Sequence, residues 1–123
     1  MVRVFDPRKR LVRCQSSLGD LVVEWCHEVL PSGGEAYDVE LEIPSTLEWG
    51  IEICLTGDRS VIASREAPML VGTLTAIDEL RVAEITFREG SALVETRGEP
   101  PPSAIGRPVE LRPPTIRVYP YDL

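Results

Sequence analysis

The sequence lacks any apolar run that approaches the roughly 20 residues a helix needs to cross a bilayer. Glu or Arg interrupts its longest apolar runs within a few positions. Residues 1–13 also lack the continuous apolar segment and the small-residue cleavage site of a secretory signal. These absences predict a cytoplasmic protein that has no contact with a membrane.

Cysteine and histidine are also scarce, with three cysteines and one histidine in 123 residues. Cys14, Cys26 and Cys54 are odd in number and widely spaced, which suits neither a disulfide framework nor the tight ligand pairs of a zinc site. A P-loop, the G-x-G-x-x-G fingerprint and the G-x-S-x-G nucleophile motif are all missing. We therefore expect reduced thiols, no bound metal and no cofactor.

The single histidine, His27, follows Cys26, and a thiol beside an imidazole is a usual starting point for nucleophilic catalysis. Neighbouring residues on a strand point to opposite faces, so these two side chains would not meet there. One alternative is a ligand-binding protein or enzyme that uses His27 and nearby acids at the mouth of a barrel. A non-catalytic role is the leading hypothesis.

Charge is unevenly placed along the chain, whose net charge is -7. Residues 1–13 carry five basic groups and one acid, and the remaining 110 residues carry eight basic groups and 19 acids. Nucleic-acid affinity comes largely from Lys and Arg that neutralise phosphates, so an acidic body makes nucleic acid an unfavourable partner. A partner protein that carries basic groups fits this charge better.

Several acidic residues are close in sequence, namely Glu40, Glu42, Glu48 and Glu52, and their carboxylates could gather on one face. With 20 acidic residues in the chain some clustering is expected, and no EF-hand pattern occurs. We interpret these carboxylates as a solvated face rather than as a calcium site or an acid–base pair.

The dominant hydrophobic period is two, which is typical of β-strands because alternate side chains lie on opposite faces. In residues 38–43, Val39, Leu41 and Ile43 fall on one face and the acids on the other. The same kind of pattern predicts strands at residues 21–29, 38–43, 51–55, 70–77, 82–88, 91–97, 109–111 and 116–119, with one more around Val2 and Val4.

Short strands with turns between them predict an all-β, mainly antiparallel protein. We expect one domain over residues 1–123, with a basic N-terminal segment at 1–13 and a proline-rich loop at 98–108. A small closed or partly open barrel of OB-like or Greek-key type is favoured, with a β-sandwich as the alternative. At most one short helix is expected, at residues 76–82, where Asp78 and Glu79 could equally form a turn.

These features favour a small non-catalytic protein-binding module, of adaptor or toxin-neutralising type, whose acidic surface engages another protein. An OB-like nucleic-acid binder that uses the basic N-terminus is a further alternative, and a homodimer through an unpaired edge strand is open as well. Aromatic side chains concentrate at binding hot spots, and basic side chains can contact an anionic partner. The candidate partner-binding residues are therefore Tyr119, Tyr121, Arg8, Lys9 and Arg10.

Overall fold

The computed structural model describes residues 2–6, 10–16, 18–31, 33–34, 36–57, 69–88 and 90–121, with residues 2–6 described for the backbone. Every regular element in these ranges is a β-strand, and none is a helix. The prediction of an all-β protein is thereby confirmed. The chain divides into two compact units, Met1–Pro44 with Thr115–Leu123 (unit 1) and Ser45–Pro114 (unit 2). That residues 1–123 fold as one domain stays a prediction.

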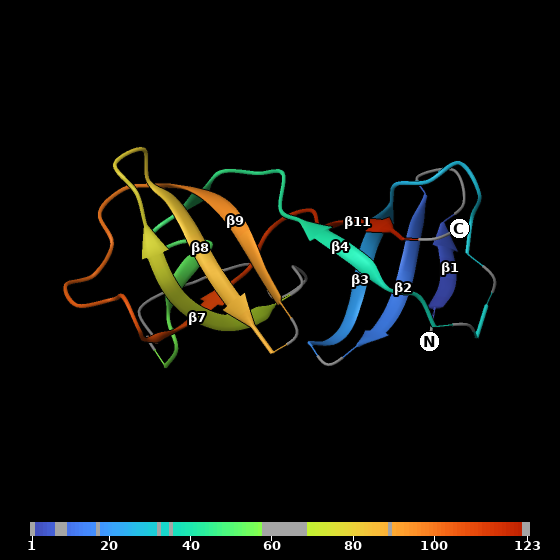
Figure 1. Ribbon diagram of the computed structural model, residues 1–123, viewed down its shortest axis with the longest axis horizontal. Coiled ribbons are helices and arrows are strands. Elements are labelled where there is room, and N and C mark those ends of the chain that lie inside the picture. The colour runs from blue at the N-terminus through green and yellow to red at the C-terminus, as the bar shows by residue number, and fades with distance from the viewer. Residues whose placement is uncertain are drawn as a thin grey trace. The chain divides into compact units, whose positions relative to one another are not determined.

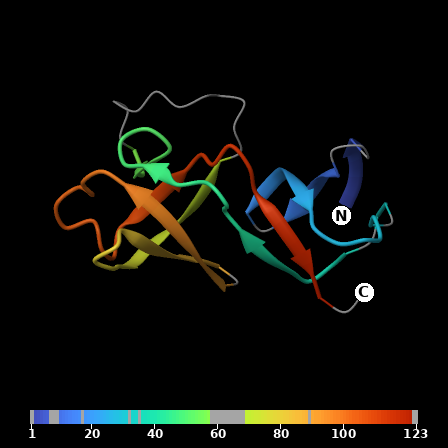
Figure 2. The ribbon, with the colours of Figure 1, turned by 90° about the horizontal axis from the view of Figure 1, so that it is seen from above.

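Unit 1 contains a five-stranded sheet in the order β1-β2-β3-β11-β4. Neighbouring strands are antiparallel except for β3 and β11, which are parallel. In Figures 1 and 2, β11 lies beside β4 although most of the chain separates them in sequence. The strands are β1 (Val2–Asp6), β2 (Leu11–Ser16), β3 (Gly19–Trp25), β4 (Val39–Glu42) and β11 (Arg117–Pro120).

One face of this sheet is apolar, as the period of two predicts. Its buried side chains come from β2, β3 and β11 and from the residues next to β4 and β11: Val12, Leu21, Val23, Trp25, Ile43, Ile116 and Val118. The Trp25 ring meets Tyr37 edge-on, with 5.2 Å between the ring centroids. Its Nε1–H donates to the Val29 carbonyl oxygen at 2.8 Å, so the buried indole keeps a hydrogen-bond partner.

Unit 2 is a six-stranded sheet in the order β5-β9-β8-β7-β10-β6, which curls into a small barrel. Its two outermost strands, β5 and β6, are consecutive in sequence and meet where Gly50 N–H donates to the Ile53 carbonyl oxygen at 2.8 Å. This contact nearly closes the barrel, as predicted. The strands are β5 (Leu47–Glu48), β6 (Ile53–Leu55), β7 (Leu70–Ile77), β8 (Val82–Phe87), β9 (Gly90–Arg97) and β10 (Pro108–Leu111).

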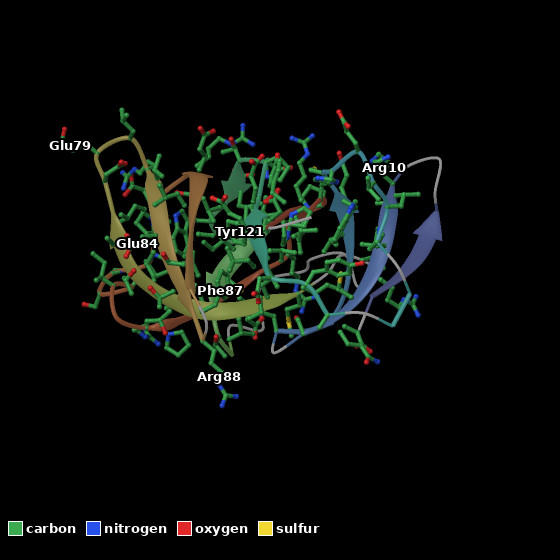
Figure 3. The ribbon with its side chains drawn as sticks, turned by 45° about the vertical axis from the view of Figure 1, so that its right-hand side comes forward. Arg10, Glu79, Glu84, Phe87, Arg88 and Tyr121 are labelled. Carbon is green, nitrogen blue, oxygen red and sulfur yellow. The ribbon has the colours of Figure 1, made fainter. Side chains whose placement is uncertain are left out.

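The candidate helix at residues 76–82 is not formed: its ends belong to β7 and β8, and residues 78–81 form the turn between them. The Asp78 carboxylate accepts hydrogen bonds from the backbone N–H groups of Leu80 and Val82, both at 2.9 Å. Such bonds favour a turn over a helix. Glu79 lies at the tip of this turn and Arg88 at the other end of β8 (Figure 3). The loop predicted at 98–108 is present and ends where Pro108 begins β10.

The strands predicted at residues 21–29 and 51–55 are shorter than expected because some of their residues form turns instead. Ile51 and Glu52 form a turn in which both backbone N–H groups donate to the Glu48 carbonyl oxygen, so β6 begins at Ile53. After Trp25, the His27 Nδ1 atom accepts from the Val29 N–H at 3.1 Å and turns the chain out of β3. The expected eight or nine strands also omitted β2 and the two-residue β5.

Among the described residues of unit 2, the hydroxyl of Thr96 is buried inside the barrel. It accepts from the Trp49 Nε1–H at 3.2 Å and donates to the Arg81 carbonyl oxygen at 2.6 Å. Arg81 has a φ of 64°, a left-handed conformation that is uncommon for a side-chain-bearing residue, and its carbonyl also accepts from the Thr96 N–H. The Thr96 hydroxyl therefore links Trp49, which follows β5, to Arg81 in the β7–β8 turn.

Replacing Thr96 with Val should destabilise the protein by about 1–3 kcal/mol, because the buried indole N–H of Trp49 loses its acceptor while the volume is almost unchanged. Chemical denaturation monitored by tryptophan fluorescence measures this change. Thr96→Ser keeps the hydroxyl and should recover most of the loss. A Thr96→Val protein as stable as the wild type would contradict this role of the hydroxyl.

Candidate protein-binding surface

The five candidate residues fall into three structural situations. Arg8 and Lys9 lie outside the described residues. Arg10, labelled in Figure 3, is bound to the backbone: its Nε donates to the Trp25 carbonyl oxygen at 3.2 Å and its own carbonyl accepts from the Trp25 N–H. Tyr119 is half-buried in β11, and Tyr121 is 54% exposed just after it. The two tyrosines therefore lie at the strand that joins β3 to β4.

Acidic side chains surround one arginine on the face of this sheet opposite its core. The register places Arg117 of β11 between Glu24 of β3 and Glu42 of β4. Its guanidinium lies 3.5 Å from a Glu24 oxygen and 3.7 Å from a Glu42 oxygen. All three side chains are more than a third exposed, so each ion pair contributes at most about 1 kcal/mol.

Glu40 extends this group along β4, opposite Tyr119 in the ladder. Residues two apart on a strand share a face, so Glu40 lies on the same side as Glu42, and Tyr119 on the same side as Arg117. We call Glu24, Glu40, Glu42, Arg117 and Tyr119 the acidic face. It carries three carboxylates against one guanidinium, and its local charge is therefore negative.

Total charge alone would not have located this surface. Unit 1 contains nine acidic and six basic residues and unit 2 contains eleven and seven, so both are moderately acidic. The four glutamates that are close in sequence also divide between the units. Glu40 and Glu42 lie on β4, whereas Glu48 and Glu52 belong to unit 2, where the Glu52 carboxylate accepts from the Glu48 N–H at 3.0 Å.

Cys26 and Tyr119 adjoin the acidic face and both have raised pKa values. Partial burial raises the pKa of the Cys26 thiol, the carboxylate of Glu24 raises it further, and a hydrogen bond from Tyr119 opposes them. Partial burial and a hydrogen bond with Glu42 raise the pKa of the Tyr119 hydroxyl. Both groups are therefore protonated at neutral pH, and Cys26 is a poor nucleophile there.

The remaining candidate groups are dispersed. His27 lies in the turn after β3 and belongs to unit 1, so it is not among the residues of the barrel in unit 2. Burial raises the pKa of the Cys14 thiol, and Cys54 is buried in β6. In the part of the chain that the structure describes, no three His, Cys, Asp or Glu side chains are grouped so that they could hold a metal ion.

Comparison with protein-family models, with curated proteins and with solved structures found no match to this chain. Among the described residues there is also no helix of the length and apolar character that crossing a membrane requires.

The raised pKa values predict slow alkylation of Cys14 and Cys26 by iodoacetamide near pH 8, relative to the urea-unfolded protein. Because both pKa values are raised, the alkylation rate should still be rising above the ordinary thiol pKa of about 8.5. Digestion after glutamate isolates Cys26 between Glu24 and Glu28, so mass spectrometry can follow it apart from the other thiols. Tyr119→Phe removes the hydrogen bond that lowers the Cys26 pKa. It should therefore slow the alkylation of Cys26 but not that of Cys14.

The same shifts have a consequence for stability. Because the folded state favours the protonated groups, their stabilisation is complete below the unfolded pKa values and is lost as the pH rises through the folded ones. Equal alkylation rates of Cys26 in the folded and unfolded protein at pH 8 would contradict this account of its surroundings.

Proposed function

We propose that the protein is a non-catalytic binding module that holds a basic segment of another protein on the acidic face of unit 1. The observation that carries this proposal is the arrangement of Glu24, Glu40 and Glu42 around Arg117 on the sheet surface opposite the core. Complementary charge steers association and selects partners, more than it adds raw affinity.

Two aromatic side chains support the same surface. Tyr119 lies within the acidic face, and Tyr121 follows it with its backbone N–H donating to the Asp38 carbonyl oxygen at 2.9 Å. Tyrosine offers a large contact area with few rotatable bonds, which is why it is frequent at binding hot spots. Arginine side chains of a partner can also stack on such rings.

The proposal predicts that a short peptide in which Arg alternates with Val binds the protein, and that Glu40→Gln with Glu42→Gln weakens binding. The loss of two partner charges should reduce affinity about 5- to 30-fold at low salt, as measured by fluorescence anisotropy of the labelled peptide. Glu79→Gln with Glu95→Gln is the matched control, because it changes the net charge equally on exposed positions of unit 2.

Added salt should weaken the wild-type complex, since a Debye length of about 8 Å at physiological salt screens exposed charges. The control variant should bind as the wild type does. Equal losses in the two double variants would mean that only net charge matters, and would contradict a site on the acidic face.

A second candidate function has one specific observation in its favour. Counted within unit 1, the sheet order is first, second, third, fifth and fourth strand, with a parallel step between third and fifth, which is the order of OB folds. OB folds commonly bind single-stranded nucleic acid, and the β1–β2 register places Arg3 opposite Arg13.

The anisotropy experiment also decides between the two candidates when a single-stranded oligonucleotide replaces the peptide. Binding by a protein that neutralises phosphates falls steeply with salt. Tight oligonucleotide binding that does not change in the Glu40→Gln, Glu42→Gln protein, together with no peptide binding, would favour the nucleic-acid function over the one we propose.

A further inference from the structure

The two units differ in how their sheets end. In unit 2 the outermost strands meet, so the barrel has almost no free edge. The sheet of unit 1 instead ends at β1 on one side and at β4 on the other. An edge strand presents a row of backbone N–H and C=O groups that another strand can pair with.

The hydrogen-bond pattern shows which backbone groups of β4 point toward β11. Even-numbered residues in β11 and directly before it bond to β3. The carbonyl oxygens of Ile116 and Val118 accept from the backbone N–H groups of Glu24 and Cys26. Odd-numbered ones face β4, as the bond from Tyr121 N–H to Asp38 shows. In an antiparallel ladder the bonded pairs alternate, so Glu40 and Glu42 bond to β11.

The N–H and C=O groups of Val39 and Leu41 therefore point away from β11, along the outer edge of the sheet. Val39 is 38% exposed, and Glu40 beside it is exposed as well. None of the strand pairings among the described residues uses this edge. It offers two donors and two acceptors in the spacing of a strand.

The side chains of β4 specify what can pair there. Apolar residues of β4 lie on the core side, and Glu40 and Glu42 lie on the acidic face. A second copy of β4 paired antiparallel around a two-fold axis would bring the four carboxylates of Glu40 and Glu42 close together, which is destabilising. A strand that alternates apolar and basic residues would match both sides.

We propose that the partner is an extended segment with Arg or Lys at alternate positions, which adds to the sheet as a strand along β4. Its backbone bonds to Val39 and Leu41, its basic side chains meet Glu40 and Glu42, and its apolar side chains extend the core face. This rests on the proposed function and adds the mode of binding, in which main-chain bonds supply affinity and side chains supply selectivity.

The test uses the alternating Arg–Val peptide and a Leu41→Pro variant. Proline removes the free N–H at Leu41 without touching a bond to β11, and edge strands tolerate proline. Leu41→Ala is the matched control, because it truncates the side chain and keeps the N–H. We expect Leu41→Pro to reduce peptide affinity at least tenfold, Leu41→Ala to reduce it much less, and both proteins to keep a far-ultraviolet spectrum of folded strand.

Two modified peptides provide a test that does not alter the protein. One carries N-methyl groups on its valines and the other on its arginines. If the peptide adds antiparallel, the residues directly opposite Val39 and Leu41 bond to them, and these are its valines. If it adds parallel, Val39 and Leu41 bond instead to the neighbours of the residues opposite them, and these are its arginines. One of the two peptides should lose binding and the other should keep it.

Each outcome separates this inference from the proposed function. Equal binding of both N-methylated peptides, with Glu40→Gln and Glu42→Gln still weakening binding, would overturn strand addition and leave the binding module intact. No binding of the unmodified peptide at low salt would overturn both. If Leu41→Pro, without peptide, lowers the free energy of unfolding by as much as the loss of one sheet hydrogen bond does, the edge is already paired, within the chain or with a second copy. That result would overturn the inference.

Discussion

The pairing of backbone N–H and C=O groups at the ends of a sheet is the constraint on which this structure depends. Each such group is costly to bury without a partner, so a sheet must close, be covered or stay in contact with water. Unit 2 closes through the Gly50 and Ile53 contact. Unit 1 has no such contact between its end strands in the described residues, and its edge at β4 is therefore available for pairing.

The position of β11 determines the properties of that edge. The strand lies between β3 and β4 and follows all of unit 2 in the sequence. Its alternate residues serve two functions at once: Val118 fills the core, and Arg117 and Tyr119 project onto the opposite face among the carboxylates of the neighbouring strands. The free energy of the fold comes mainly from the apolar side, because exposed ion pairs add little.

Much of the fold could be predicted from the sequence because the period of two is a direct consequence of strand geometry. It predicted the strands around Leu74, Ile85 and Val94. It failed at Ile51 and at His27, where side chains and carbonyls close local turns that break an apolar pattern. The two-residue strand β5 is too short to have a period at all.

The site was harder to predict, because it depends on long-range register. Tyr119 and Tyr121 could be predicted from their aromatic character, and the period of two places Glu40 and Glu42 on one face. Nothing local indicated that Arg117 would lie between Glu24 and Glu42, because this depends on the parallel pairing of β11 with β3 and its antiparallel pairing with β4. Likewise, no local signal marks β4 as an edge strand, since its sequence would suit an interior position equally well.

Amide hydrogen exchange along β4, resolved residue by residue by NMR, tests the central claim most directly. Amides that bond within a sheet are protected, and those on an open edge exchange with solvent. The account predicts that in the free protein Glu40 and Glu42 are protected while Val39 and Leu41 exchange rapidly, and that the basic peptide protects Leu41. Equal and strong protection of all four amides in the free protein would contradict it, because the edge of unit 1 would then already be paired.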